Sequence, residues 1–233
     1  MINWKKYWST YPTTVKGTDY LRQVGKTLQR QPILSSQFQC IVDDTASHLQ
    51  LQPDDSLLDL CCGNGLITVN LASRCNNVVG IDYSEPLLAV AKRDHQRDNI
   101  KYILSSILDF DLAALSAGGL FSKIVMYEAL QHFKKGDLHQ ILRVISTLTA
   151  DNALILIGSI PDRTLKWKFY NTPKRQLIAI WRQLTGRDII GSWWTREEIS
   201  RIARQMGFHS QFLAQNYKLH TAQYRFDVLL RKA

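Results

Sequence analysis

The amino-acid sequence predicts an α/β fold: a doubly wound, mostly parallel sheet with helices on both faces and an antiparallel strand at its C-terminal edge. Two observations carry this prediction. From about residue 53 onward, short apolar runs alternate with segments of helical periodicity, which is typical of parallel strands joined by crossover helices. The last two apolar runs lie too close together to hold a crossover helix, so we expect them to pair antiparallel at one edge of the sheet.

The expected elements follow this alternation along the chain. We expect strands at residues 56–60, 78–81, 101–104, 123–127, 153–157, 208–214 and 224–230. Helical periodicity covers residues 66–74, 85–95 and 137–148, and further helices are expected within residues 174–206. A chain of 233 residues, of which 45% are hydrophobic, can bury the core of one such domain.

Residues 1–50 precede the first expected strand and carry a helical pattern with several aromatic side chains on one face. We interpret this segment as an N-terminal helical lid over a domain formed by residues 51–233. The aromatic residues are Trp4, Tyr7, Trp8 and Tyr11. Such a stripe is more often used for packing than for binding a ligand, and the sequence leaves both readings open.

The composition predicts a soluble, cytoplasmic protein without a membrane partner. No run of about 18 apolar residues is present, and the first 20 residues lack the pattern of a secretory leader. The four cysteines are a poor layout for a disulfide framework, because Cys61 and Cys62 are adjacent, so we expect reduced thiols. The sequence does not indicate the oligomeric state.

The net charge of +9 lies in the last third of the chain. Residues 161–233 contain 14 Lys and Arg against 5 Asp and Glu, whereas the two classes balance in residues 1–160. Within this third, residues 163–187 carry seven basic side chains, no acidic one and several aromatic ones. The segment is therefore either the solvated face of a helix or a surface that faces an anion.

The stretch SLLDLCCGNGLITVNLA at residues 56–72 places a glycine turn directly after the first expected strand. In an open parallel sheet the ligand crevice lies at the carboxyl ends of the strands, and glycines there let a ligand approach the backbone. A metal site is not expected, because adjacent cysteines cannot converge on one ion as a Cys-x-x-Cys pair does. The phosphate-loop motif is absent. A nicotinamide dinucleotide is disfavoured by Thr68 in place of a third glycine and by Asp59, which would repel a pyrophosphate.

Two acidic residues flank this turn and suit a different ligand. Asp59 fits the cationic end of a ligand, and Asp82 follows the second strand, where a carboxylate accepts hydrogen bonds from ribose hydroxyls. Through LLDLCCGNGL, VVGIDYSEPLLAVAK and FSKIVMYEALQHF, the chain resembles the class I S-adenosylmethionine-dependent methyltransferases over about residues 53–160. The resemblance implies a Rossmann-like fold and S-adenosylmethionine as the cofactor.

The resemblance also implies a set of cofactor-binding residues. These are Asp59, Gly63, Asn64, Gly65, Asp82, Tyr83, Ser106 and Ile107. The methionine part is expected against the glycine turn, the ribose on Asp82 and the adenine near Tyr83. The chain departs from the family at Cys61, where glycine is usual, and at Ser106, where an aspartate often binds the adenine amino group. Either Ser106 takes that role or Asp109 reaches in.

Two residues after the fourth strand are the candidate catalytic groups. Methyl transfer needs an acceptor aligned with the sulfonium, exclusion of water and, for a hydroxyl acceptor, removal of a proton. Glu128 resembles residues that line the methyl-transfer cleft in the family. His132 is the candidate general base, because an unperturbed imidazole titrates near neutral pH. It could instead pack under the cofactor or cap the next helix.

The expected activity is methylation, more often on oxygen than on nitrogen, of a small-molecule or carrier-borne acceptor with an anionic handle. In the resembling family the fifth strand is often followed by an insertion that covers the substrate, here the basic segment at about residues 161–192. One alternative is an RNA methyltransferase or RNA-binding module that uses the basic last third of the chain. The absence of an appended RNA-binding domain argues against a nucleic-acid partner. A non-catalytic scaffold that binds the cofactor is a further alternative.

Overall fold

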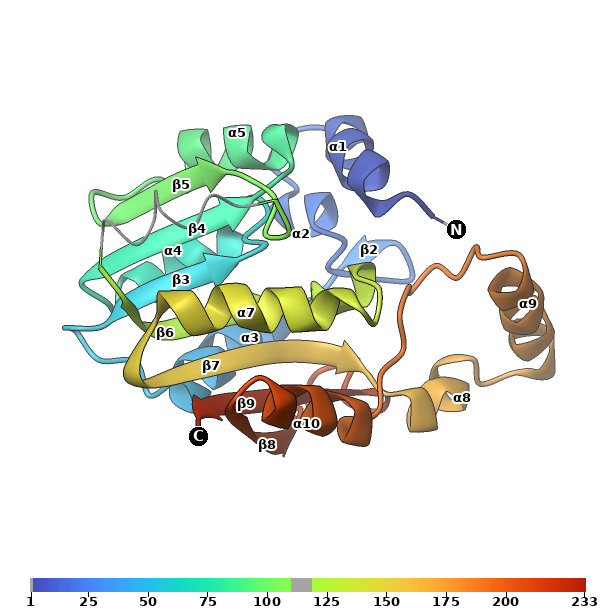
Figure 1. Ribbon diagram of the computed structural model, residues 1–233. Coiled ribbons are helices and arrows are strands. Elements are labelled where there is room, and N and C mark those ends of the chain that lie inside the picture. Colours follow the sequence, from blue (N-terminus) through green and yellow to red (C-terminus); the bar gives the residue numbers. More distant parts are fainter. Residues whose placement is uncertain (1, 110–118) are drawn as a thin grey trace.

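The computed structural model describes residues 2–109 and 119–233, and it shows one large sheet with helices on both of its faces (Figure 1). The strands of the large sheet are β3 (Ser56–Leu60), β4 (Asn77–Asp82), β5 (Ile100–Leu104), β6 (Phe121–Tyr127), β7 (Thr149–Pro161), β8 (Phe208–Ala214) and β9 (Arg225–Lys232). A separate hairpin consists of β1 (Thr27–Leu28) and β2 (Gln31–Pro32). The α-helices are α1 (Trp4–Thr14), α2 (Tyr20–Gln23), α3 (Ser35–His48), α4 (Leu66–Ala72), α5 (Glu85–Asp94), α7 (Asp137–Leu148), α8 (Lys166–Phe169), α9 (Pro173–Leu184) and α10 (Arg196–Gln205), and two short 3-10 helices are η1 (Leu130–His132) and η2 (Arg163–Leu165).

The strand order of the large sheet is β5-β4-β3-β6-β7-β9-β8. All pairs from β5 to β7 are parallel, and β9 runs antiparallel to both of its neighbours, β7 and β8. This confirms the predicted doubly wound sheet and the antiparallel pair at its C-terminal edge. Within that pair β9 is inserted next to β7, and β8 forms the outer edge. The chain order reverses between β3 and β6, which places the expected ligand crevice at the carboxyl ends of these two strands.

Side chains from alternate positions of the strands supply the two apolar layers of the core, because successive residues of a strand point to opposite faces. Leu58 and Ile124 pack with α7 and α10 on one face. Leu57 and Val125 pack with α3, α4 and α5 on the other. All four of these side chains are inaccessible to solvent. The sheet is thus a rigid base whose carboxyl end carries the loops.

The predicted N-terminal lid divides into two structurally different parts. Helix α3 belongs to the core layer, because Val42 and Ala46 pack on the sheet with Leu49. Helix α1 contributes a single buried residue, Pro12, and lies beside α5 at the carboxyl end of the sheet (Figure 1). Only the part before α3 is therefore placed to cover a ligand.

The predicted insertion after the fifth strand forms a helical excursion between β7 and α10. It comprises η2, α8 and α9, and in Figure 1 these orange elements extend beyond the arrowhead of β7. The excursion and α1 thus flank the same end of the sheet. In the part of the chain that the structure describes, no helix is both long and apolar enough to cross a bilayer.

Candidate functional site

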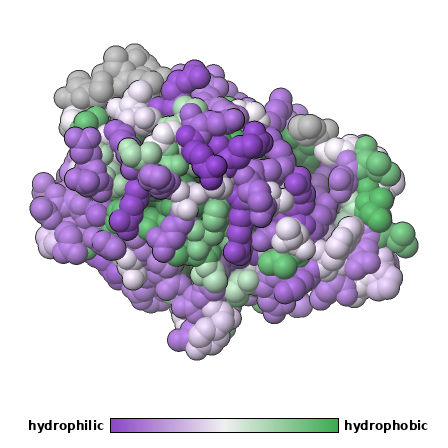
Figure 2. Space-filling view, turned by 60° about the horizontal axis from the view of Figure 1, so that its bottom comes forward, coloured by the Kyte–Doolittle hydropathy of each residue, from purple (hydrophilic) through white to green (hydrophobic). Residues whose placement is uncertain are grey.

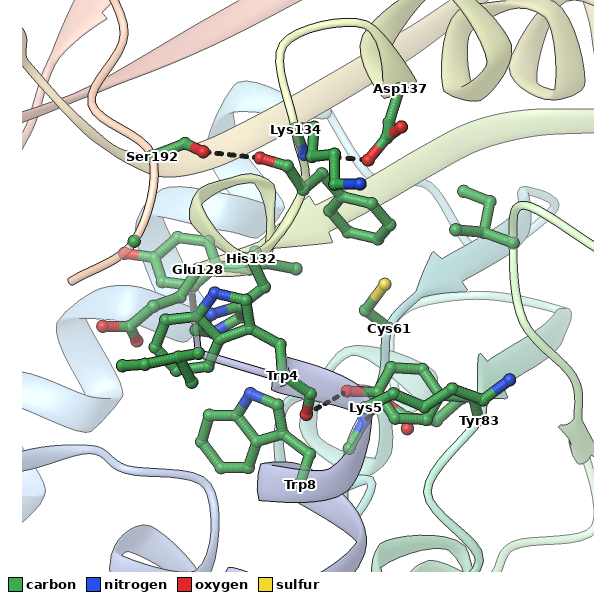
Figure 3. A pocket seen from close by; sticks show the side chains of 18 of the residues that line it. Trp4, Lys5, Trp8, Cys61, Tyr83, Glu128, His132, Lys134, Asp137 and Ser192 are labelled. Atoms are coloured by element: carbon green, nitrogen blue, oxygen red, sulfur yellow. Dashed lines mark hydrogen bonds between the residues drawn. The ribbon is translucent and has the colours of Figure 1, made fainter. Parts of the chain in front are cut away.

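A cavity of about 840 Å³ opens at the carboxyl ends of the central strands (Figure 3). Its wall is assembled from the glycine turn, the ends of β4, β5 and β6, the N-terminal segment and the insertion. The sequence-predicted residues on this wall are Gly63, Asn64, Asp82, Tyr83, Ser106, Ile107, Glu128 and His132. Asp109 lies on the wall as well, so the structure keeps both candidates for the adenine amino group. Asp59 and Gly65 are not part of it.

Asp82 is held in a fixed orientation at the end of β4. Its two carboxylate oxygens accept hydrogen bonds from the backbone N–H groups of Gly63 and Ser84, each at 2.8 Å. Burial raises the pKa of this carboxyl group, and the backbone donors act against that shift. The side chain is 8% exposed and faces the cavity, so its remaining lone pairs are available to a ligand.

The turn after β3 has left-handed backbone geometry at three positions. Gly63 has φ 58° and Gly65 has φ 75°, and a Cβ on Gly65 would collide with the Tyr102 hydroxyl. Gly65 therefore serves close packing behind the cavity. Cys61 adopts φ 62°, a conformation that costs a non-glycine residue about 1–2 kcal/mol. The strained position is the one at which the family usually has glycine. The small side chain of Cys61 lines the cavity.

Asp59 lies beneath the turn and not on the cavity wall. From the sequence, Asp59 was expected to lie against the ligand. Its Oδ2 atom accepts a hydrogen bond from the Thr68 hydroxyl at 2.6 Å. In the sequence, Thr68 was notable only because it stands where a dinucleotide-binding motif has its third glycine. Burial raises the pKa of Asp59 to about 7, and the charge of Asp82 adds to the rise. In the structure the partner of this carboxyl group is the Thr68 hydroxyl. Contact of Asp59 with a cofactor stays a prediction.

We expect the buried Asp59 carboxyl to make the protein less stable as the pH rises from about 4 to about 7. A carboxyl whose folded-state pKa is raised binds more protons in the folded state over this window, so the free energy of unfolding falls, here by about 2–4 kcal/mol. In Asp59→Asn this fall should be much smaller. Urea unfolding at several pH values measures it, with the exposed Asp54→Asn as the matched control. Parallel pH profiles for the protein and Asp59→Asn would contradict the assignment.

The N-terminal segment is fastened to the cofactor side of the cavity by polar contacts. Tyr83 donates its hydroxyl hydrogen to the Trp4 carbonyl oxygen at 3.1 Å (Figure 3). Ser84 donates its hydroxyl hydrogen to the Trp8 carbonyl oxygen at 2.7 Å. The Asn64 side-chain amide donates to the Tyr20 carbonyl oxygen at 2.9 Å. Asn64 thus joins the N-terminal segment to the glycine turn, in addition to lining the cavity.

Lys26 is a site residue that sequence reasoning missed. Its ammonium group lies 2.7 Å from Oε2 of Glu128 and 4.9 Å from the centre of the Tyr127 ring. Arg225 of β9 approaches the other oxygen of Glu128 at 3.9 Å. Burial acts to raise the pKa of Glu128, but the two cations outweigh it, and the pKa is lowered. Glu128 is therefore ionised at neutral pH. A single lysine in a polar segment carries no pattern that could have indicated this role.

His132 packs between two aromatic rings of α1. The centre of its ring lies 4.4 Å from that of Trp4 and 5.4 Å from that of Trp8 (Figure 3). Burial lowers its pKa to about 3, and the positive charge of Arg225 contributes to the shift. Its Nδ1 atom is buried and has no hydrogen-bond partner among the described residues. His132 is thus a neutral imidazole that lines the cavity, with its Nδ1 atom closed off from solvent.

The basic insertion contributes less free charge to the cavity than its sequence indicates. Lys166 lines the cavity but is bonded to Gln183 at 2.8 Å and to Asp188 at 3.4 Å. In contrast, Lys5 and Lys134 are on the wall and form no ion pair with an acidic residue of the described chain. These two lysines are the positive charges that remain available to a ligand.

A metal centre finds no support in this arrangement. Within residues 2–109 and 119–233, no group of three or more His, Cys, Asp and Glu side chains is placed to hold an ion. Burial raises the pKa of Cys61 and of Cys62 well above the usual thiol value, so both thiols stay protonated. Protonated, buried cysteines behave as small apolar side chains.

Comparison with known proteins adds to this geometry. Residues 57–152 match the family described as "Methyltransferase domain". The probable cobalt-precorrin-6B C(15)-methyltransferase (decarboxylating) of Methanocaldococcus jannaschii is 34% identical over 124 residues, which are 49% of this chain and 64% of that protein. The 2-phytyl-1,4-naphtoquinone methyltransferase of Nostoc sp. is 36% identical over 81 residues, which are 29% of this chain and 35% of that protein. The chain thus spans less than two thirds of the length of these relatives.

Solved structures share the fold over almost the entire chain. The crystal structure of magnesium protoporphyrin IX methyltransferase from Synechocystis PCC 6803, with bound S-adenosylhomocysteine, superimposes with a TM-score of 0.70 at 15% identity. The superposition covers 98% of this chain and 97% of that one. Three observations indicate the same kind of protein. They are the strand order of the sheet, the glycine turn with Asp82 beside it, and the match of residues 57–152 to a methyltransferase domain. Residues 57–152 therefore belong to the methyltransferase domain family, and the chain around them has the fold of a class I S-adenosylmethionine-dependent methyltransferase.

Proposed function

We propose that this protein transfers the methyl group of S-adenosylmethionine to a small-molecule acceptor, with an oxygen atom as the acceptor atom and an anionic group as the handle. One observation carries the proposal. A single cavity joins Asp82 and the glycine turn at one end to Glu128, His132 and Trp193 at the other. A volume of about 840 Å³ is near the upper end of ordinary ligand pockets, which span about 300–1,000 Å³, so a cofactor and an acceptor can share it.

The residues at one end of the cavity fit the cofactor. Asp82 presents a fixed carboxylate, which suits the two hydroxyls of a ribose. Gly63 has φ 58°, and a Cβ there would crowd the Val24 side chain at 3.1 Å, so glycine suits a turn whose backbone a ligand approaches. We assign the adenine to Tyr83, Ile107 and either Ser106 or Asp109, because these residues line the same cavity.

When bound, S-adenosylmethionine supplies an activated methyl group, so the protein contributes alignment and exclusion of water. Trp4 and Trp8 cover the cavity from the N-terminal side and hold the ring of His132. We assign His132 to the orientation of an acceptor hydroxyl, because a neutral imidazole nitrogen accepts a hydrogen bond. Its low pKa makes it a weak base. Glu128 fixes the position of Lys26 at the acceptor end.

Three features support a small, anionic acceptor. Lys5 and Lys134 stand at the cavity wall without acidic partners in the described chain, so an acidic group of the acceptor would find opposite charge there. The names of the two relatives point to small organic substrates. Several cations of the basic last third are engaged internally, as in the pairs of Lys166 with Asp188 and of Arg163 with Glu198, which leaves fewer for a nucleic-acid backbone.

Ligand binding and turnover test the proposal separately. We expect S-adenosylhomocysteine to raise the melting temperature, whereas NAD leaves it unchanged. Incubation with methyl-labelled S-adenosylmethionine and fractions of a small-molecule extract should then transfer label to a compound that binds an anion-exchange resin. Transfer of label to bulk tRNA, with retention on heparin that falls steeply with salt, would favour the RNA alternative. Stabilisation by NAD alone would overturn the assignment of the cofactor.

The two tryptophans of α1 are expected to matter more for transfer than for the fold. In Trp4→Ala/Trp8→Ala we expect the melting temperature to change by a few degrees, because Pro12 is the only buried residue of α1. Methyl transfer should fall at least about tenfold more than the affinity for S-adenosylhomocysteine, since the acceptor end loses its cover. Tyr7→Ala on the same helix is the control, because Tyr7 is not on the cavity wall. Equal losses of transfer, affinity and stability would instead give α1 a purely structural role.

A further inference from the structure

Helix α9 turns its apolar side away from the protein. In an ordinary surface helix the apolar stripe faces the core, yet the only buried residue of α9 is Ala179. Its large apolar side chains are between 39% and 82% exposed, and they are Leu177, Ile178, Ile180, Trp181 and Leu184. Figure 2 shows a corresponding hydrophobic patch at the right of the molecule, where Figure 1 places α9. Trp167 of α8 is also half exposed.

Polar contacts hold the opposite side of α9 in place. Gln183 accepts a hydrogen bond from the buried ammonium group of Lys166, and Ala179 packs in a small aromatic cluster with Tyr170 and Trp193. The outward direction of the apolar side therefore follows from specific bonds on the inner side. An exposed stripe of this kind on one helix marks a contact surface.

The charges around this stripe have one sign. Residues 163–187 carry seven basic side chains and no acidic one. Lys168, Lys174 and Arg175 are exposed. Arg187 is also exposed, with its guanidinium group 5.8 Å from the centre of the Trp181 ring. A helix with leucine, isoleucine and tryptophan on one side and cations beside them has the composition of helices that lie in the interface of a bilayer.

We propose that α9, together with Trp167, binds the surface of bilayers that contain anionic lipids. The apolar side chains would enter the boundary between headgroups and acyl chains, and the cations would meet the lipid phosphates. Gln183, Gly186 and Asp188 line the cavity, so its mouth would lie close to the bilayer. The sequence-based expectation of no membrane partner rested on the absence of a long apolar run, which an interfacial helix does not need.

Two other occupants fit this surface less well. A second copy of the chain would place the exposed cations Lys168, Lys174, Arg175 and Arg187 opposite the same four, and like charges across an interface are unfavourable. One exposed helix face also offers less area than the roughly 1,200–2,000 Å² of a stable protein interface. Tryptophan side chains are enriched where apolar and aqueous regions meet, which favours a bilayer.

Co-sedimentation with vesicles tests the proposal without any methyl acceptor. We expect the protein to sediment with vesicles made of phosphatidylcholine and phosphatidylglycerol. With vesicles made of phosphatidylcholine only, we expect the protein to remain in the supernatant. In Leu177→Gln/Leu184→Gln the partition coefficient should fall at least about tenfold. Replacing Lys174 and Arg175 by Gln should lower the partition coefficient about fivefold for each charge removed. Added salt should also lower the partition coefficient, because it screens the attraction between the cations and the lipid phosphates.

The matched control is Leu34→Gln/Leu120→Gln, which changes two other exposed leucines in the same way. It should bind vesicles like the unaltered protein, and all variants should keep their affinity for S-adenosylhomocysteine. Absence of binding to the anionic vesicles, or an equal loss in the control, would overturn the proposal. A dimer in sedimentation velocity that Leu177→Gln/Leu184→Gln dissolves would assign the surface to a second copy instead. None of these outcomes depends on whether the acceptor is known.

Discussion

Asp82→Ala should raise the dissociation constant for S-adenosylhomocysteine at least about a hundredfold. The Asp82 carboxylate is buried at the cavity wall and is oriented by the backbone N–H groups of Gly63 and Ser84. Each hydrogen bond between a charged group and a ribose hydroxyl contributes about 1.5–3 kcal/mol, and two such bonds are lost. Isothermal titration calorimetry measures the change.

Two further variants separate this effect from a disturbance of the turn. Asp82→Ala also removes the acceptor for the N–H groups of Gly63 and Ser84, so the turn is free to shift. Asp82→Asn keeps the shape and one acceptor oxygen, and we expect it to lose about tenfold in affinity. Asp109→Ala, on the same wall without these bonds, should show a smaller loss. Unchanged affinity in folded Asp82→Ala would place the ribose elsewhere.

Much of the fold could be predicted because local patterns and the sheet agree. Residues 137–148 were expected as a helix, and α7 has these bounds, since its apolar residues recur at the spacing of one helix face. The sequence also indicated that β8 and β9 pair antiparallel, because the connection between them is too short for a crossover. The position of α3 in the core could not be predicted, because periodicity shows that a helix has an apolar face but not which surface that face meets.

The candidate site could be predicted where residues follow the ends of strands. Asp82, Tyr83, Ser106 and Ile107 lie on the cavity wall for this reason. Asp59 shows the limit of the argument, because a residue near a strand end can point beneath the turn as well as above it. The direction depends on the left-handed geometry of the turn, which no spacing in the sequence encodes.

The basic insertion and Lys26 were outside the reach of sequence patterns for a different reason. For residues 163–187 the sequence left a solvated face and an anion-facing surface open. It did not indicate that α9 exposes its apolar side, because that orientation depends on the contact of Lys166 with Gln183. Lys26 meets Glu128 across 102 positions of the chain. Such a pairing results from tertiary structure alone.

The ion pair between Lys26 and Glu128 leads to the second large expected effect. Lys26→Met should lower the free energy of unfolding at neutral pH by about 3 kcal/mol, because it leaves Glu128 partly buried with only the more distant Arg225 as counter-charge. For a chain of this length the melting temperature should fall by about 6–12 °C. The side chains of Lys26 and Glu128 are 6% and 23% exposed, so solvent screens the pair only in part.

A double variant and a change of pH distinguish this pair from simple loss of packing. Lys26→Met/Glu128→Gln removes both charges of the pair, so we expect part of the lost stability to return, although Arg225 loses its more distant counter-charge. The lowered pKa of Glu128 stabilises the folded state above the usual carboxyl pKa, and this stabilisation is lost as the pH falls through the folded-state value. The gap between the unaltered protein and Lys26→Met should therefore narrow below about pH 4. Thermal unfolding of all three proteins at neutral and acidic pH measures both effects. Additive losses in the double variant, together with a gap that does not depend on pH, would show that Lys26 acts through its methylene groups and not through its charge.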